Sequence, residues 1–369
     1  MRKRFIPVAL ALLCLLLSMQ TPRGMRYEHL KLPGPVSAHV FTVDPEYASI
    51  KLVHAGDHTL ALETVSSLAR RHGAFAAVNG GFFRKEGRFG GCSSGVLKID
   101  HQWLSEPRRN RAALGWKNGG KVVLIDRLGL QAILKVHGES FLIDAINQPR
   151  AQGQTVLYTD YFYPYTLTDL KGFETAIDAA GRVISIKDQG ITPIPPKGFV
   201  YSIDPCSSLE IPPTYEGELA QCEFIPLPQN EPENREAWEE MEYVVGGTPV
   251  LISNGNVITD FTCERTIETF LTKQHPRTAV GILPNGHWVF VVVEGKLPEI
   301  SLGMTMNELA QFMHSLGCVY ALNLDGGGSS ALYIKDQLRN TPSGVDEDSP
   351  DAKMGDERPV SDAILIFAQ

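Results

Sequence analysis

Beyond its first residues, the chain lacks any apolar run long enough to cross a membrane. The one pronounced run, IPVALALLCLLLS, follows the basic start MRKRF and is too short to span a bilayer comfortably. This pattern predicts a secretory signal over residues 1–24, so we expect a secreted or periplasmic protein with no stable membrane span after cleavage. An uncleaved signal anchor is the alternative.

The chain also lacks an excess of positive charge. Its formal net charge is −8 over 369 residues, and no basic stripe is visible. These features argue against nucleic acid as a partner. A hydrophobic content of 43% and a charged content of 21% are those of an ordinary globular protein.

Metal-binding motifs are missing as well. The ten histidines are scattered without an HExxH or HxH pattern, the acids of 346–351 lack EF-hand spacing, and no CxxC occurs. We therefore predict no metal and no cofactor. Five cysteines remain if Cys14 leaves with the signal segment, and we expect Cys206 and Cys222 to form a disulfide because export favours one and they flank a polar, proline-rich stretch.

Most of the chain has the pattern of antiparallel hairpins. Asn-Gly or a related turn separates two β-rich runs in each of four segments, 111–125, 175–188, 248–260 and 277–295. The segment 202–243 differs, because prolines and acids dominate it, and we interpret it as a surface insertion that is partly helical after Pro232.

Two helices are predicted between the hairpins. Residues 305–317 open with a capping box of Thr305 and Glu308, and residues 62–73 carry apolar side chains on one face. The fold class is therefore α+β: large mixed or antiparallel twisted sheets with a few packed helices, in a single catalytic domain over 25–369.

The motif LDGGGSS places a carboxylate, Asp325, between an apolar strand and consecutive glycines. Backbone amides of Gly326, Gly327 and Gly328 can approach an anion closely because no Cβ intervenes, and the Ser329 hydroxyl adds a donor. No Gly-Lys-[Ser/Thr] follows, which excludes a Walker loop. The alternative is a tight turn in which Asp325 caps its own backbone.

A second strand ends in the same way. Asn79 and Gly80 of VNGGFF follow a helix, a glycine and an apolar strand, as Asn323 and Asp325 do. This recurrence favours a functional interpretation, because two such strand ends can converge on one cleft.

Three charged residues flank other strands. Arg277 and Thr278 open the strand of HPRTAVG, Glu294 follows β-forming residues in VVVEGK, and Arg358 precedes the last strand. An arginine at such a position can bind a phosphate or carboxylate in a bidentate manner. A surface arginine at a strand end is the alternative.

One rival motif is GCSSG, residues 91–95, which fits the nucleophile elbow of serine hydrolases with Ser93 as nucleophile. That elbow requires a strand before it and a helix after it. Here a glycine-rich loop precedes the motif and a strand follows, so we place an esterase well behind the other interpretations.

Several motifs together resemble the phosphodiester glycosidase family. They are, in order, VNGGFF, GGCSSG, RAALGW, NQPRAQGQTVLYT, GGTPVLISNG, HPRTAVGI, VVVEGK, the helix–strand block ending in LDGGGSS, and RPVSDAILIF. The resemblance implies a hydrolase that cleaves the bond between a sugar's anomeric carbon and a phosphodiester. A glutamate, Glu294, stands where the family motif leads us to expect aspartate.

The resemblance also implies roles for the candidate residues. Asp325, Glu294 and Arg277 are the expected catalytic residues. The expected substrate-binding residues are Asn79, Gly80, Thr278, Asn323, Gly326, Gly327, Gly328, Ser329 and Arg358. The expected partner is a sugar-phosphodiester, such as one from a cell-envelope glycan, and a non-catalytic module that binds anionic glycans is the alternative.

Overall fold

The computed structural model describes residues 21–106, 111–208, 215–344 and 353–369. Most of the predicted signal segment, residues 1–20, therefore lies outside the described residues. None of the helices in the described part combines the length and apolar character that a membrane crossing requires.

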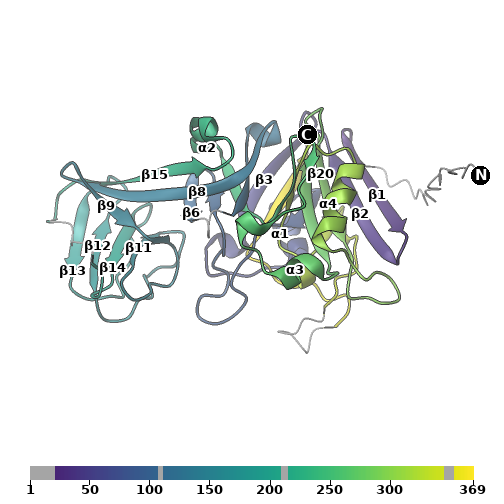
Figure 1. Cartoon of the computed structure of the whole chain (residues 1–369). Helices are drawn as coiled ribbons and strands as arrows, with labels where there is room; N and C mark the ends of the chain where they lie inside the picture. The colour runs from purple at the N-terminus through teal and green to yellow at the C-terminus, as the bar shows by residue number, and fades with distance from the viewer. Residues whose placement is uncertain (1–20, 107–110, 209–214, 345–352) are drawn as a thin grey trace, which may run out of the picture.

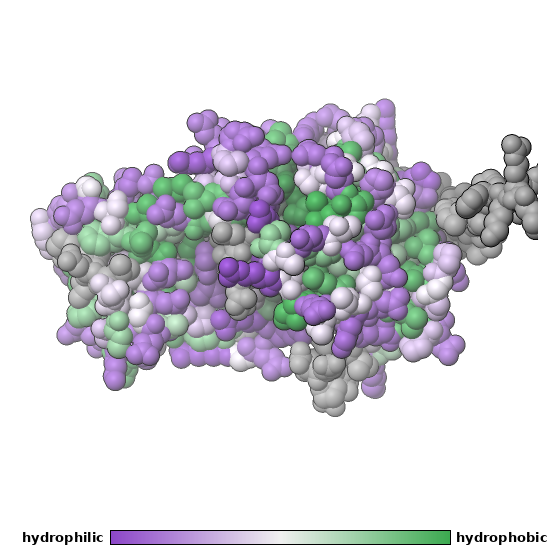
Figure 2. Space-filling model, viewed as in Figure 1, coloured by the Kyte–Doolittle hydropathy of each residue, from purple (hydrophilic) through white to green (hydrophobic). Residues whose placement is uncertain are grey.

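Two lobes lie side by side along the long axis of the molecule, and the long strand β8 with its partner β15 runs from one to the other (Figure 1). Figure 2 shows hydrophilic residues spread over the visible face of both lobes, with hydrophobic residues in smaller areas between them.

The larger lobe is a sandwich of sheets. The first sheet contains, in spatial order, β1 (Met25–Leu32), β2 (Val36–Val43), β20 (Trp288–Val293), β19 (Arg277–Ile282), β21 (Tyr320–Asn323), β17 (Val250–Ser253) and β18 (Asn256–Val257). The second contains β23 (Gln337–Leu338), β22 (Leu332–Ile334), β4 (Ala76–Asn79), β24 (Asp362–Ala368) and β3 (Ala48–His54). Side chains of both sheets share one apolar core.

Alternation along the central strands explains how the first sheet is covered on both sides. In β20, Phe290 and Val292 enter the core of the sandwich, while Val291 and Val293 face the opposite side. There Leu309 and Met313 of helix α4 (Met306–Ser315) cover them. A strand that is apolar on both faces is thus buried between a sheet and a helix.

The other helices are short. They are α1 (Val65–His72), α2 (Arg235–Glu239) and α3 (Glu268–Thr272). Helix α1 packs on β4, β22 and β24. The capping box predicted for Thr305 and Glu308 is present at α4, and Thr64 caps α1.

The remaining sheets build the second lobe and join it to the larger one, because Leu114, Trp116 and Val245 belong to the apolar core of the sandwich. One contains β15 (Ala220–Pro228), β8 (Val122–Val136), β7 (Ala112–Lys117), β16 (Tyr243–Gly246), β5 (Leu97–Ile99) and β6 (Gln102–Ser105), with β9 (Glu139–Ile143) beside β8. The other contains β10 (Ala145–Ile146), β11 (Thr155–Thr159), β14 (Phe199–Ile203), β12 (Phe173–Ile177) and β13 (Val183–Lys187).

Sheets dominate the fold, and the predicted hairpins are present. The segment 277–295 forms β19 and β20, and its turn places Gly286 at φ 82°. The turns of the hairpins over 248–260 and 175–188 likewise place Gly255 and Gly181 at a φ of 76°. Glycine adopts this left-handed conformation without steric cost.

The segment 202–243 is more than a surface excursion. Residues 220–228 form β15, which pairs with β8 along its whole length, and Trp238 of α2 is buried. The polar residues of β15 obscured this strand, because they alternate with apolar residues whose partners lie far away in sequence.

The predicted disulfide between Cys206 and Cys222 is wrong, since both cysteines are free. Cys206 is exposed at a turn after β14, whereas Cys222 lies opposite Leu134 in the ladder between β15 and β8. The two cysteines flank the same segment in the sequence, but their sulfur atoms do not meet in the structure.

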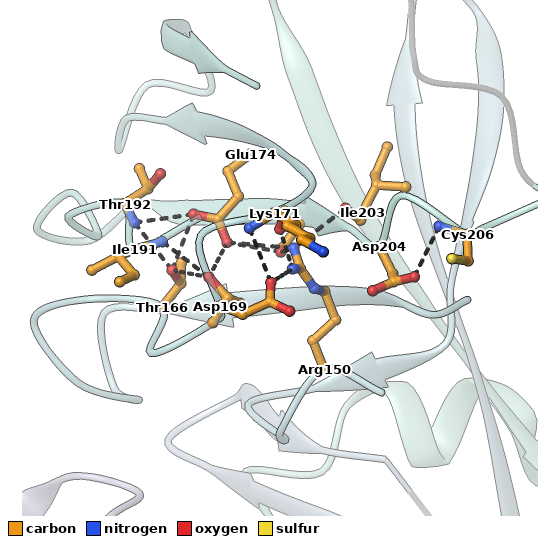
Figure 3. A network of polar contacts seen from close by, with 12 residues as sticks. Arg150, Thr166, Asp169, Lys171, Glu174, Ile191, Thr192, Ile203, Asp204 and Cys206 are labelled. Atoms are coloured by element: carbon orange, nitrogen blue, oxygen red, sulfur yellow. Dashed lines mark hydrogen bonds and ion pairs between the residues drawn. The ribbon is translucent and has the colours of Figure 1, made fainter. Parts of the chain in front are cut away.

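A buried charged network holds the second lobe (Figure 3). The fully buried carboxylate of Glu174 accepts hydrogen bonds from the Thr166 hydroxyl and the Thr192 amide, both at 3.0 Å. The guanidinium of Arg150 lies 3.9 Å from it and donates to Asp169 at 2.7 Å. The Glu174 carboxylate and the Arg150 guanidinium both have internal hydrogen-bond partners, so we assign the network to the stability of the lobe.

Candidate functional site

The two polar strand ends predicted from sequence meet in the structure. The side-chain amide of Asn79, at the end of β4, donates to the carbonyl oxygen of Asp325 at 2.7 Å. The Asp325 amide in turn donates to the carbonyl oxygen of Gly80 at 3.1 Å. The ends of β4 and β21, which belong to different sheets, are thus joined at one end of the sandwich. We call this end, where Asn79 and Asp325 meet, the mouth.

The side-chain oxygen of Asn79 also forms hydrogen bonds within the protein. Its Oδ1 accepts from the Thr278 hydroxyl at 2.8 Å and from the Ala331 amide at 3.2 Å. Asn79 and Thr278 are both fully buried. These two predicted substrate-binding residues therefore form a floor beneath Asp325.

Asp325 has the electrostatic environment of a proton-transferring group. Burial raises the pKa of its carboxyl. The nearby Ser329 hydroxyl, the hydrogen bond from the Gly326 amide and the charges of Arg358 and Lys85 offset only part of that rise, and the pKa is about 6. The residue as a whole is half-buried. A carboxyl with such a pKa exchanges protons near neutral pH.

Arg358 lies directly against the glycine run. A Cβ placed on Gly328 would come within 2.5 Å of Arg358 Nη2, so the absence of a side chain at 328 lets the guanidinium sit there. Arg358, which we predicted to be an anion ligand, therefore lies beside the loop that carries Asp325.

The glycine amides are less free than the sequence suggested. Gly326 donates to Asp325 Oδ1 at 2.9 Å, and Gly327 donates to the carbonyl oxygen of Pro276 at 2.9 Å. These two amides hold the turn in shape, so cationic side chains rather than these amides are the nearby groups suited to an anion.

Arg277 reaches the site through its backbone. Its guanidinium is fully buried and donates to the carbonyl oxygens of Met304 at 2.9 Å, Phe270 at 2.7 Å and Lys273 at 3.0 Å. Burial lowers the pKa of Arg277 to about 10. The structure therefore gives Arg277 carbonyl partners in place of the phosphate or carboxylate that we expected, and its predicted role as an anion ligand stays a prediction.

Glu294 lies at the same mouth, where β20 ends. Burial raises the pKa of its carboxyl, but the nearby His39 ring, the Ser37 hydroxyl and the Thr341 amide offset this rise and lower the pKa to about 2. The Thr341 amide lies 2.6 Å from Glu294 Oε1. Glu294 is thus a carboxylate at any ordinary pH, in contrast to Asp325.

Gly295 and Gly326 connect the two acids in space. A Cβ on Gly295 would lie 2.5 Å from the Pro276 nitrogen, and one on Gly326 would lie 2.8 Å from the Pro276 oxygen. Both glycines therefore pack against the same residue, which places the backbone next to Glu294 and the backbone next to Asp325 on either side of Pro276.

Two residues of the site escaped the sequence analysis. Asp362, at the start of β24, is buried and accepts a hydrogen bond from the Gly81 amide at 2.8 Å. Its Oδ1 would lie 2.0 Å from a Cβ on Gly80. Lys85, in the loop after VNGGFF, contributes positive charge at Asp325. The acid in RPVSDAIL and the basic pair after NGGFF were the available signals.

Buried polar atoms without a hydrogen-bond partner flank the glycine run in the sequence. Within the described residues, Oδ1 of Asn323 and Oγ of Ser330 are two such atoms, one on each side of the glycine run. The amide nitrogen of Asn323, in contrast, donates to Thr248 and Leu324. Because native proteins pair almost all buried polar atoms, these two atoms are candidates to meet a ligand at this site.

A polar cavity of about 520 Å³ lies beyond the loop that follows Gly81. Its lining residues include Arg84, Ser94, Glu106, Asp144, Gln148 and Gln154. Arg84 lines the cavity while its neighbour Lys85 acts on Asp325. One short segment therefore connects this cavity with the carboxyl at the sandwich mouth.

The esterase motif does not form a nucleophile elbow. Ser93 is buried, and its hydroxyl donates to the carbonyl oxygen of Gly95 at 2.9 Å. The next regular element is the strand β5 rather than a helix. The strand–turn–helix geometry that exposes such a serine is therefore missing at residues 91–95.

Comparison with known sequences points in one direction. The model of the phosphodiester glycosidase family matches residues 172–367. The mouse N-acetylglucosamine-1-phosphodiester alpha-N-acetylglucosaminidase is 31% identical over 109 residues, which span 27% of this chain and 21% of the mouse enzyme. An uncharacterized protein of Rickettsia conorii is 26% identical over 230 residues, spanning 62% of this chain and 77% of that protein.

Solved structures share the fold. A hypothetical protein from Synechocystis superposes with a TM-score of 0.77 at 22% identity, covering 94% of this chain and 62% of that chain. An exported protein from Burkholderia pseudomallei gives a TM-score of 0.74 at 21% identity, covering 92% of this chain and 75% of that one. Since the family model covers more than half of the sequence and includes both β19 and LDGGGSS, this chain belongs to the phosphodiester glycosidase family.

Proposed function

We propose that this protein is an exported hydrolase that cleaves the glycosidic bond of a sugar-1-phosphodiester, releasing free sugar and a phosphomonoester. Family membership supports the reaction class, and the N-terminal basic and apolar segment supports export. A cell-envelope glycan is the substrate that best suits an exported protein.

The observation that carries this proposal is the environment of Asp325. A carboxyl with a pKa of about 6 stands beside two cations, Arg358 and Lys85, in a loop flanked by the unpaired buried atoms Asn323 Oδ1 and Ser330 Oγ. Glycosidases need a carboxyl that exchanges protons near neutral pH, and a phosphodiester needs cations at its charged oxygens. One site supplies both.

Asp325 acts in this proposal as the general base. A water oxygen attacks the anomeric carbon and gives its proton to the Asp325 carboxylate, while the bond from that carbon to the phosphate oxygen breaks. The bonding electrons leave with the phosphate, and Arg358 and Lys85 stabilise its increased charge. A phosphomonoester is a good leaving group, so no strong acid is required.

Glu294 and Arg277 take different roles. Glu294, whose pKa is about 2, stays ionised and stabilises the positive charge that develops on the sugar ring. Arg277 is a positioning residue, because its guanidinium fastens the segment around Phe270 and Lys273 to the start of β19. The polar cavity beside Arg84 receives the part of the substrate beyond the phosphate.

The test is a panel of sugar-1-phosphodiesters incubated with the purified protein, with free sugar and its anomer followed by NMR. We expect release with the native protein and none with Asp325→Asn. Asp188→Asn is the matched control, because Asp188 is an exposed aspartate between β13 and β14. Full activity of Asp325→Asn would overturn the assignment.

A second candidate function is a non-catalytic module that binds anionic glycans. The cations beside the glycine run favour it as much as they favour catalysis. Saturable binding of a sugar phosphate without turnover of any phosphodiester in the panel would support this alternative and contradict the hydrolase.

A further inference from the structure

Three side chains that the sequence separates widely meet on the first sheet. His29 of β1 lies directly opposite His39 of β2 in the antiparallel ladder. Next to them the Glu294 amide donates to the Ser37 carbonyl oxygen at 2.9 Å. Because side chains two positions apart share a face of a strand, His29, His39 and Glu294 all lie on the same face of the sheet.

Their ligand atoms are close enough to share one ion. One ring nitrogen of each histidine and one carboxylate oxygen of Glu294 all lie within 4.8 Å of one another. His39 Nε2 is 3.3 Å from Glu294 Oε1. His39 and Glu294 are 1% and 5% exposed, whereas His29 is exposed on the edge strand, so the group is open to solvent from one side.

The buried histidine is held as a ligand would be. The Tyr27 hydroxyl is hydrogen-bonded to His39 Nδ1 at 2.8 Å, which directs Nε2 toward Glu294. That Nε2 atom is buried and faces Glu294 Oε1 without meeting the geometry of a hydrogen bond. Metal-bound histidines characteristically use their second nitrogen in such an orienting hydrogen bond.

We propose that His29, His39 and Glu294 form a binding site for a divalent transition-metal ion, with Zn²⁺ as the best match to two imidazoles and one carboxylate. Three protein ligands of these types leave a fourth position open for water or a ligand. The site shares Glu294 with the reaction proposed above, but the evidence for it is donor geometry and does not depend on catalysis.

Binding requires one side chain to turn. The two imidazole rings are stacked, with centroids 4.2 Å apart and planes 9° from parallel. Lone pairs of ring nitrogens lie in the ring planes, so parallel stacked rings do not point at one ion. The exposed His29 ring can rotate into place and give up its 2.8 Å hydrogen bond with the Ser37 hydroxyl.

A bound ion would join the edge strand β1 to β2 and β20. It would also place positive charge on Glu294, at the same mouth of the sandwich as Asp325. The absence of metal-ligand spacing along the chain led us to predict no metal. A pair of histidines across two strands leaves no such spacing.

Isothermal titration of the chelator-treated, tag-free protein with ZnCl₂ tests the proposal, and Co²⁺ absorption reports on the ligands. We expect one ion per chain, a rise in Tm with Zn²⁺, and loss of saturable binding in His29→Ala and His39→Ala. Tyr27→Phe should weaken binding by about 10- to 100-fold. His287→Ala is the control, since His287 lies beside a single carboxylate, Asp44.

The exposed position of His29 keeps the test decisive if His39→Ala fails to fold. Unchanged Zn²⁺ affinity in folded His29→Ala, or no binding by the native protein, would overturn the site and leave His39 and Glu294 as an ordinary ion pair. Failure of the metal site would not affect the sugar-release assay, so the two proposals stand or fall separately.

Discussion

The side-chain amide of Asn79 donates a 2.7 Å hydrogen bond to the carbonyl oxygen of Asp325, a residue 246 positions later in the chain. This bond joins the ends of two strands from different sheets and fixes the position of the loop that carries the catalytic candidate. The pH dependence, anion binding and stability of the site all follow from how that loop is held.

The activity of the proposed hydrolase should depend on the ionisation of Asp325. If its carboxylate is the general base, kcat/KM should rise with pH through about 6, where this group loses its proton. Glu294 is already ionised at this pH, so its titration adds no second change to the profile of kcat/KM against pH. A pH profile of sugar release measures this dependence. A profile in which kcat/KM does not rise near that pH would exclude Asp325 as the base.

The stability of the protein should carry the same signature. The pKa of Asp325 is raised on folding, so its contribution to stability is full at low pH and is lost as pH rises through about 6. Asp325→Asn has no carboxyl to ionise at this position, so it does not lose this contribution as pH rises. The variant should therefore gain about 2–3 kcal/mol relative to the native protein between about pH 4 and pH 8. Urea unfolding at both pH values tests this, and a constant difference would contradict it.

Gly328→Ala should displace Arg358 while retaining its charge. The added Cβ would lie 2.5 Å from Arg358 Nη2, and the flexible side chain can move away at little cost in stability. Losing a charge-assisted contact to phosphate should reduce kcat/KM roughly 10- to 100-fold. Gly95→Ala is the control, because its Cβ would make an ordinary 3.5 Å contact. Equal activity of both variants would exclude a role for Arg358.

Arg277→Ala should destabilise the protein, because the buried guanidinium bonds three backbone carbonyl groups. It leaves the carbonyl oxygens of Met304, Phe270 and Lys273 without their donor. We expect a loss of about 3 kcal/mol or more in the free energy of unfolding. Arg277→Lys should lose less, since one ammonium retains part of the contacts. An inactive Arg277→Ala with native stability would restore the direct role in anion binding.

Glu174→Gln should weaken the second lobe without changing the chemistry. The substitution places an amide among donors such as Thr166 and leaves Arg150 without its buried counter-charge. Breaking such a pair costs about 3–5 kcal/mol. Glu223→Gln removes an exposed ion pair with Lys135 and should cost less than about 1 kcal/mol. Similar losses in the two variants would contradict the assigned role of the network.

Local patterns in the sequence determined the elements of this protein. Glycine turns specified hairpins such as β19–β20, and the pairing of Thr305 with Glu308 specified the start of α4, because each depends on neighbours within a few residues. The carboxylate and glycines of LDGGGSS likewise marked a strand end with its own chemistry.

Only the tertiary structure decided what each polar side chain meets. It turned the Arg277 guanidinium toward backbone carbonyls, added Asp362 and Lys85 to the site, left Cys206 and Cys222 apart, and brought His29 and His39 together across two strands. The physical reason is that burial, pKa and ligand geometry depend on contacts between strands far apart in the chain, and no local spacing encodes those contacts.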